Sequence, residues 1–210
     1  AETAKEREQA QQWCSLITPV LKAAWTQQAF EGASACLQVF GGHGYIREWG
    51  IEQIVRDSRV AMIYEGTNEI QAIDLLVRKV LPDGGQSMGQ WLLLLRKSLD
   101  AGRPLDAEVL RCLAQLRYFT TLLAQACKED DTLAWRVADD YLRCIAVVLM
   151  GWAWAQIGAT AGTDQPRWQG PLKQVLQRIL PEMDWRMNLM KAQWTQASLV
   201  HGNQAFTPAN

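Results

Sequence analysis

The chain has 210 residues, of which 49% are hydrophobic and 20% charged, as is usual for a protein that buries a core. At ~150 residues per domain, this length fits one large domain or two small ones. The formal net charge of −1 excludes a strongly basic surface for nucleic acid.

The longest apolar run covers 12 residues, 144–155. A bilayer span needs about 20, so we expect a buried helix there and no transmembrane segment. The five cysteines are scattered, and the histidines, His43 and His201, are far apart. We therefore expect no metal site, and reduced core thiols in a cytoplasmic protein. The chain begins without Met in a charged segment that has no signal-peptide core, so we interpret it as a piece of a longer polypeptide.

Helical patterns dominate and no clean strand alternation is present, which predicts an all-α fold. A first helix is expected over residues 3–16. Thr18 as N-cap and Pro19 at the first helical position predict a second helix that runs to Phe40. Gly41 and Gly42 then end it, since glycine adopts positive φ readily.

A loop is expected over 43–50, a short helix over 51–60 and a connector over 61–66. Thr67 or Asn68 is expected to cap the next helix. Its apolar residues recur at helical spacing and predict its buried stripe: Ile70, Ile73, Val77 and Val80.

The strongest break in the chain is Pro82-Asp83-Gly84-Gly85, which we take as a domain boundary. The predicted organisation is a helical domain over 1–82, a linker over 83–87, a helical extension over 88–202 and a tail over 203–210. The extension is expected to hold helices at 88–101, 105–128, 131–161 and 170–200, a loop at 162–170, and a kink or restart at Pro181. Two of these helices carry apolar stripes: Val109, Leu113, Leu116, Phe119 and Leu123, and Leu133, Val137, Tyr141, Ile145, Leu149 and Trp152.

Glu65 is the candidate catalytic residue. It follows Met62, Ile63 and Tyr64 and precedes Gly66 at the start of a predicted helix. Burial in such a setting raises the pKa of a carboxyl group and suits a base that works near neutral pH. An acidic residue is also favoured at a helix N-terminus by the helix dipole. The pattern alone leaves both interpretations open.

Three motifs, QVFGGHGY, IEQIVRDSRV and IYEGTNEIQ, occur in this order between residues 38 and 71. Together they closely resemble the C-terminal helical domain of the flavin-dependent acyl-CoA dehydrogenases, over about residues 1–80. The segments TPVLKAAW and EGTNEIQAIDLLVRKVL are especially similar to large bacterial members with an extra C-terminal helical domain. These members include enzymes acting on 3-methylmercaptopropionyl-CoA.

The resemblance implies roles for individual residues. Glu65 matches the base that removes the α-proton of the acyl thioester, and its backbone N–H matches a donor to the thioester carbonyl. Tyr64 and Gly66 match positions that bind substrate. The residues that match cofactor-binding positions are Gln38, Gly42, Thr67 and Glu69, with Gln38 and Gly42 reaching the adenosine-diphosphate part of FAD held mainly by a neighbouring subunit.

The resemblance further implies FAD in the full-length enzyme, an acyl-CoA substrate, electron-transfer flavoprotein as electron acceptor, and a homo-oligomer. The family's N-terminal helical domain and middle β-domain, which surround the flavin ring, have no counterpart here. We therefore expect this chain alone to bind no FAD and to be inactive. Two alternatives stay open: a non-catalytic helical module for oligomerisation, and an acyl-CoA oxidase.

Overall fold

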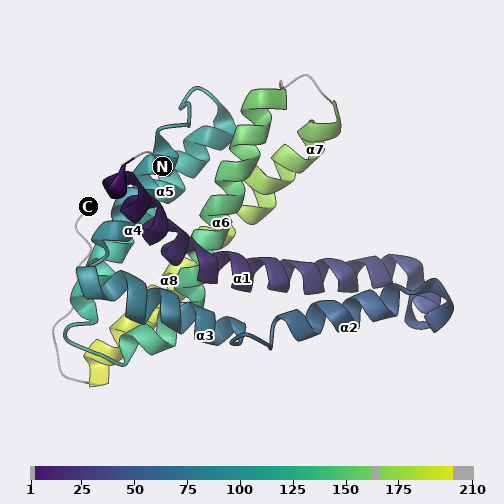
Figure 1. The fold of residues 1–210 in the computed structure, drawn as a ribbon, viewed down its shortest axis with the longest axis horizontal. Coiled ribbons are helices and arrows are strands. Elements are labelled where there is room, and N and C mark those ends of the chain that lie inside the picture. Colours follow the sequence, from purple (N-terminus) through teal and green to yellow (C-terminus); the bar gives the residue numbers. More distant parts are fainter. Residues whose placement is uncertain (1–2, 162–165, 201–210) are drawn as a thin grey trace.

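The computed structural model describes residues 3–161 and 166–200, and every regular element among them is helical. The predicted all-α class is therefore confirmed. Helices α1 (Ala4–Phe40) and α2 (Ile51–Ala61) run alongside each other and project from the rest of the molecule as an arm (Figure 1). The other helices form a bundle around α6 (Leu133–Ala161).

Helix α1 is continuous, so the predicted break before Pro19 is wrong. Thr18 does not cap a helix: its hydroxyl donates to the Cys14 carbonyl one turn earlier, 2.7 Å away. Pro19 has no N–H for the Ser15 carbonyl, and Lys79 Nζ donates to that oxygen instead, at 2.9 Å. A lysine 64 residues away in sequence thus takes the place of the missing backbone bond.

The outer end of the arm, which we call the tip (residues 41–50), is more ordered than the predicted loop. It contains two 3₁₀ helices, η1 (Gly41–Tyr45) and η2 (Arg47–Trp49). The ring of Trp49 lies 6.2 Å from that of Phe40 and 5.5 Å from that of His43, measured between centroids. These aromatic contacts fold the tip back onto the end of α1.

After α2, a connector (residues 62–67) leads into α3 (Asn68–Ile73) and the π-helical segment η3 (Asp74–Val80). Thr67 caps α3, as predicted, and accepts a hydrogen bond from the Ile70 N–H. The predicted stripe is partly wrong, because Ile70 is 53% exposed and Ile73 and Val77 are only half-buried. The wider π turn rotates the face that points inward, and the buried residues are Ala72, Leu75, Leu76 and Val80.

The chain breaks where predicted, through η4 (Leu81–Asp83) and two left-handed glycines, Gly84 and Gly85. Helix α4 (Gln86–Arg96) follows, and its first N–H groups are capped by the Asp83 carboxylate. One buried core cluster includes residues on both sides of this break, from Leu16 to Met190. The domain boundary itself stays a prediction.

The extension continues with α5 (Pro104–Ala126), α6, α7 (Pro166–Gln174), the π-helical η5 (Val175–Ile179) and α8 (Glu182–Val200). The chain turns at Leu180–Pro181 and helix α8 starts at Glu182, as Pro181 predicted. Residues 166–170 are helical and not part of a loop, since proline is well tolerated at the first helical position. The rest of that predicted loop, and the tail, lie outside the described residues. The α5 stripe is fully buried, and the α6 stripe is buried or packed against the core.

Helix α6 is long and apolar enough to cross a bilayer by length and composition, the only such helix in the ranges described. It contacts α1, α3, α5, α7 and α8, and it occupies the centre of the bundle. Arg143 on α6 pairs with Glu182 of α8, and Arg186 of α8 pairs with Asp140 of α6. These contacts explain its apolar composition by burial in the protein core.

Candidate functional site

The connector between α2 and α3 has an unusual backbone. Glu65 has φ of 55° and is the one non-glycine residue with positive φ in the described ranges; Gly66 follows with φ of 84°. A left-handed conformation costs a residue with a Cβ roughly 1–2 kcal/mol, so the surrounding structure must hold it in place. Positive φ at consecutive residues turns the chain sharply at Glu65.

Hydrogen bonds from both sides fix this turn. Lys22 Nζ, from α1, donates to the Gly66 carbonyl at 2.5 Å and to Asn68 Oδ1 at 3.2 Å. Gln71 Nε2, from α3, donates to the Glu65 carbonyl at 3.0 Å. Asn68 is 7% exposed and donates to the Ala23 carbonyl on α1. These residues lock the connector against α1 and α3.

Sequence reasoning missed Lys22 and Gln71, and it considered Asn68 only as a possible cap. A local signal existed for Asn68 and Gln71, which lie within the IYEGTNEIQ motif. Lys22 lies in the TPVLKAAW segment, but 44 residues separate it from Gly66, and nothing in the sequence linked the two.

The side chains of Glu65 and Tyr64 are exposed, Tyr64 by 53%. The predicted apolar burial of Glu65 is therefore wrong for the described part of this chain, because nothing in it covers the connector's outer face. The Glu65 carboxylate has no hydrogen bond or ion pair within that part, and its backbone N–H has no acceptor there. A free carboxylate and a free N–H thus lie on one residue.

The other two predicted residues in this region lie at the start of α3. Thr67 is its N-cap and Glu69 is exposed in its first turn. A hydrogen bond from its own backbone N–H and one from the Thr67 hydroxyl lower the pKa of Glu69 below its usual value. Glu69 is therefore an anion stabilised by the start of α3.

Gln38, in the last turn of α1, and Gly42, in the tip, are close in sequence and are both exposed. A Cβ placed on Gly42 would meet nothing within 4 Å, so this glycine faces open space. Gly41 ends α1 with φ of 60°, whereas a Cβ on the buried Gly44 would come within 2.6 Å of the Leu37 carbonyl oxygen. The sequence did not single out Gly44.

The structure brings Tyr64, Glu65, Gly66, Thr67 and Glu69 together but not Gln38 and Gly42. The whole of α2, with 11 residues and a length of roughly 16 Å, separates the two groups. They form two locations on the arm, one at the connector and one at the tip (Figure 1).

Two hollows on the molecule lie elsewhere. One, of about 580 Å³, lies between the start of α1 and residues 78–87, and the other, of about 150 Å³, lies between α4 and α5. None of the predicted site residues lines either. The connector is thus an exposed surface and not an enclosed pocket.

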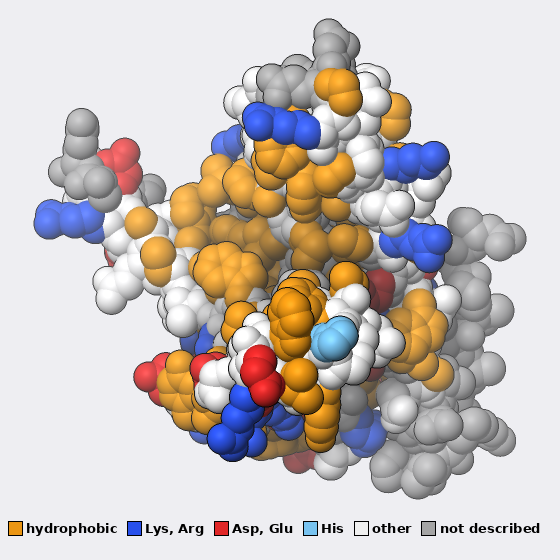
Figure 2. Space-filling view, turned by 90° about the vertical axis from the view of Figure 1, so that its right-hand side faces the viewer, with side chains coloured by type: hydrophobic (Ala, Val, Ile, Leu, Met, Phe, Trp, Pro, Cys, Tyr) orange, Lys and Arg blue, Asp and Glu red, His pale blue; other side chains and the backbone are white. Residues whose placement is uncertain are grey.

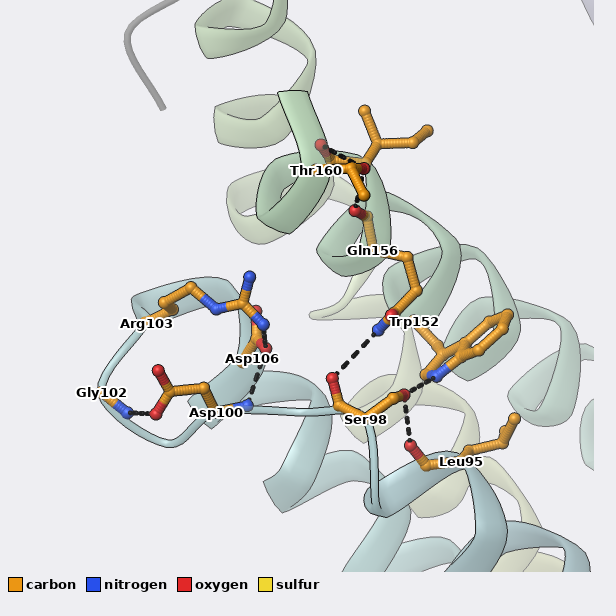
Figure 3. Close-up of polar contacts among 10 residues, drawn as sticks. Leu95, Ser98, Asp100, Gly102, Arg103, Asp106, Trp152, Gln156 and Thr160 are labelled. Carbon is orange, nitrogen blue, oxygen red and sulfur yellow. Dashed lines mark hydrogen bonds and ion pairs between the residues drawn. The ribbon is translucent and has the colours of Figure 1, made fainter. Parts of the chain in front are cut away.

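The extension contains a well-bonded loop between α4 and α5 (Figure 3). Asp106 is 1% exposed; it accepts hydrogen bonds from the Asp100 N–H and from Arg103. Ser98 accepts a hydrogen bond from Trp152 Nε1 of α6 at 2.9 Å. These hydrogen bonds attach the loop to α5 and α6.

Among the described residues, no group of three or more His, Cys, Asp or Glu is placed to bind a metal ion. Burial raises the pKa of the Cys112 and Cys144 thiols to about 12 and that of Cys127 to about 11, which makes them unreactive core groups. Cys14 and Cys36 are exposed, so the expectation that all five are core thiols is wrong for these two.

One family model and several curated relatives match this chain, and their names describe acyl-CoA dehydrogenases. Residues 1–80 match the family model described as "Acyl-CoA dehydrogenase, C-terminal domain". The chain is 34% identical over 163 residues to 3-methylmercaptopropionyl-CoA dehydrogenase of Ruegeria pomeroyi. This match covers 74% of this chain and 27% of that protein. It is 28% identical over 158 residues to the broad-specificity linear acyl-CoA dehydrogenase FadE5 of Mycobacterium tuberculosis, covering 70% of this chain and 26% of that one.

The chain therefore spans about a quarter of the length of these relatives. A match of 163 residues is too long to lie within residues 1–82, so the similarity extends past the break into the helices that follow. A shorter match, 37% identical over 71 residues, is to an acyl-CoA dehydrogenase of Bacillus subtilis and covers 34% of this chain and 18% of that protein.

Proposed function

Because residues 1–80 of this chain are an acyl-CoA dehydrogenase C-terminal domain, we propose that the chain is the C-terminal part of a flavoenzyme. This enzyme converts an acyl-CoA thioester to the trans-2-enoyl-CoA. The observation that supports this best is the left-handed turn that presents Glu65 to solvent with both its carboxylate and its N–H unoccupied.

In this proposal Glu65 is the general base. The C–H next to a thioester carbonyl is a weak acid, and its removal develops negative charge on the carbonyl oxygen. The Glu65 carboxylate takes the α-proton while the Glu65 N–H donates to that oxygen. One such donor is worth about 2.7–4 kcal/mol in oxyanion sites. Tyr64 and Gly66 flank Glu65 and bind the acyl group and the approaching thioester.

In this proposal, parts of the enzyme outside this chain cover Glu65. The exposed connector becomes a water-free site only when other domains close over it. This accounts for the exposure of a residue that the sequence predicts to be desolvated.

The residues present fit FAD in part. Bound FAD would supply the hydride acceptor for the β-carbon. Gln38 offers an exposed amide at the end of α1, and Gly42 leaves open space beside the backbone for a ribose or phosphate. Thr67 and Glu69 lie near Glu65 at the start of α3. The length of α2 between the two groups supports the assignment of Gln38 and Gly42 to the FAD of a neighbouring subunit.

The proposal extends to assembly and location. Acyl-CoA is the substrate, electron-transfer flavoprotein the electron acceptor, and the enzyme a cytoplasmic homo-oligomer. Figure 2 looks onto the tip end of the arm, where hydrophobic side chains cover much of the visible surface. Large apolar side chains that are at least 44% exposed follow the arm: Trp25, Val39, Phe40, Tyr45, Ile46, Trp49, Ile54, Val60, Ile63 and Tyr64. Apolar surface of this extent is characteristic of a face that other chains or domains cover.

The test is Glu65→Gln in the intact enzyme. The amide keeps the shape of the side chain but cannot take a proton, so flavin should stay bound while its bleaching by acyl-CoA is abolished. Glu31→Gln, an exposed acid on α1, is the matched control and should bleach at the normal rate. Near-normal bleaching in Glu65→Gln would refute the assignment of the base.

A further inference from the structure

The turn at Glu65 needs external support, since a residue with a Cβ is held at φ of 55°. Left-handed backbone outside glycine persists only where the surroundings over-determine it. Within the connector, the Gly66 carbonyl is the group most tightly held, by Lys22 Nζ at 2.5 Å. The lysine therefore acts on the peptide unit between Gly66 and Thr67, one residue beyond Glu65.

Lys22 is itself held in place. Its ammonium group also donates to Asn68 Oδ1 at 3.2 Å, and the Thr26 hydroxyl lies 3.1 Å from the same oxygen. Asn68 is buried, and its amide nitrogen donates to the Ala23 carbonyl at 3.2 Å. Lys22, Thr26 and Asn68 thus form a small network between adjacent turns of α1 and the start of α3.

Lys22 differs from Lys79, which also donates to a main-chain carbonyl, in the groups that surround its ammonium. Lys79 also donates to a main-chain carbonyl, of Ser15, but it forms an ion pair with Asp74 at 2.8 Å. Lys22 is half-buried and has no carboxylate within 4 Å in the described ranges. Its hydrogen-bond acceptors are both neutral oxygens, of Gly66 and Asn68, and its charge also acts on the Glu69 carboxylate from beyond hydrogen-bond distance. A charged donor orients such neutral acceptors strongly.

We propose that Lys22 is a positioning residue for Glu65. By holding the Gly66 carbonyl it fixes the peptide plane between Gly66 and Thr67, and Gln71, by holding the Glu65 carbonyl, fixes the plane between Glu65 and Gly66. Together they fix the direction in which the Glu65 side chain and N–H point. This inference rests on the proposed function, in which both groups act on one substrate.

The experiment uses the intact, flavin-loaded enzyme with Lys22→Met, which keeps the length of the side chain but removes its donors. A misplacement of about 1 Å can cost about 100-fold in rate. We therefore expect flavin bleaching at saturating acyl-CoA to slow by roughly 10- to 100-fold per bound flavin, with little change in KM. An acyl-CoA deuterated at the α-carbon should show a larger isotope effect than in the wild type, because proton removal becomes more rate-limiting.

Two further variants separate positioning from stability. Lys22→Arg keeps the charge and donors and should recover much of the rate. Lys79→Met removes a similar hydrogen bond, from a lysine to the Ser15 carbonyl, that does not involve the connector. It should lower thermal stability and leave the rate per flavin unchanged. Hydrogen exchange of the peptide 62–71 should be several-fold faster in Lys22→Met than in Lys79→Met, as expected when a local opening becomes easier.

A normal rate and normal isotope effect in Lys22→Met would overturn the inference, as would an equal loss of rate in Lys79→Met. If Lys22→Met does not retain flavin, Gln71→Leu, which frees the Glu65 carbonyl, provides the same test with the same expected direction. Glu65→Gln is measured in parallel. If Glu65→Gln is still bleached by acyl-CoA, the proposed function itself is rejected. If Glu65→Gln is inactive while Lys22→Met behaves as the wild type, only the role of Lys22 is rejected.

Discussion

At the residue scale, three glycines of the tip are glycine for three different reasons. Gly41 adopts φ of 60° to end α1, Gly42 faces open space, and Gly44 fits where a Cβ would lie 2.6 Å from the Leu37 oxygen. The sequence predicted a helix stop at Gly41 and Gly42 from their conformational freedom. It could not predict the crowding at Gly44, because that depends on how the tip folds back on α1.

Substitutions at two of these glycines should separate binding from stability. Gly44→Ala should lower the thermal midpoint of the protein, because the added methyl group overpacks a closed site at a cost of about 1–3 kcal/mol. Gly42→Val should leave the midpoint unchanged and reduce flavin affinity of the intact enzyme, because its side chain fills space that a ribose or phosphate needs. Thermal melts and flavin titrations measure the two effects. Loss of acyl-CoA binding with full flavin retention in Gly42→Val would reverse the assignment.

At the scale of elements, α1 shows where local signals mislead. A threonine followed by proline is a good helix start, and on sequence alone the interpretation was sound. The helix continues because the carbonyl freed by Pro19 finds Lys79, a partner that only the packing of η3 against α1 provides. Similarly, the π turn in η3 shifts the buried face from the predicted stripe to Leu75 and Leu76. Stripes on the regular helix α5 were predicted correctly, since nothing interrupts their period.

A double-mutant cycle tests the interpretation of Pro19. Lys79→Met should destabilise the protein by about 1–3 kcal/mol, because the Ser15 carbonyl loses its donor. In a Pro19→Ala background the new N–H can bond to that carbonyl, so the same Lys79→Met change should cost clearly less. Urea unfolding of the four proteins gives the coupling energy. Equal costs in both backgrounds would mean that the ion pair with Asp74, and not the carbonyl, is what Lys79 contributes.

At the scale of the whole molecule, the bundle packs around a buried core, whereas the arm leaves many large apolar side chains exposed. Helix α3, η3 and the first part of α1 pack on the extension in one core, whereas the rest of α1, the tip and α2 project with large apolar side chains exposed. The all-α class and the place of Glu65 between two helices could be predicted from the sequence. Its exposure could not, because the apolar residues beside Glu65 in sequence do not show which segments cover the connector in the fold.

The isolated chain should therefore fold as helix, self-associate through the arm, and carry no FAD. Purified protein should be colourless, and titration with FAD should show no saturation, since Gln38, Gly42 and Thr67 are few contacts for so large a cofactor. Sedimentation should show association that depends on protein concentration. A yellow preparation with one flavin per chain would mean that the missing domains contribute far less to cofactor binding than we propose.

The unbroken course of α1 has a mechanical consequence. The helix begins at the surface of the bundle and ends at the tip, and Figure 1 shows it bend along its length, with Pro19 as the expected cause. The 22 residues from Pro19 to Phe40 make a lever roughly 33 Å long. On this geometry, a tilt of about 5° at its root would move the tip by on the order of 3 Å. Leu16 and Val20 pack in the core at the root of this lever, so the burial of two aliphatic side chains also sets where a distant binding surface lies.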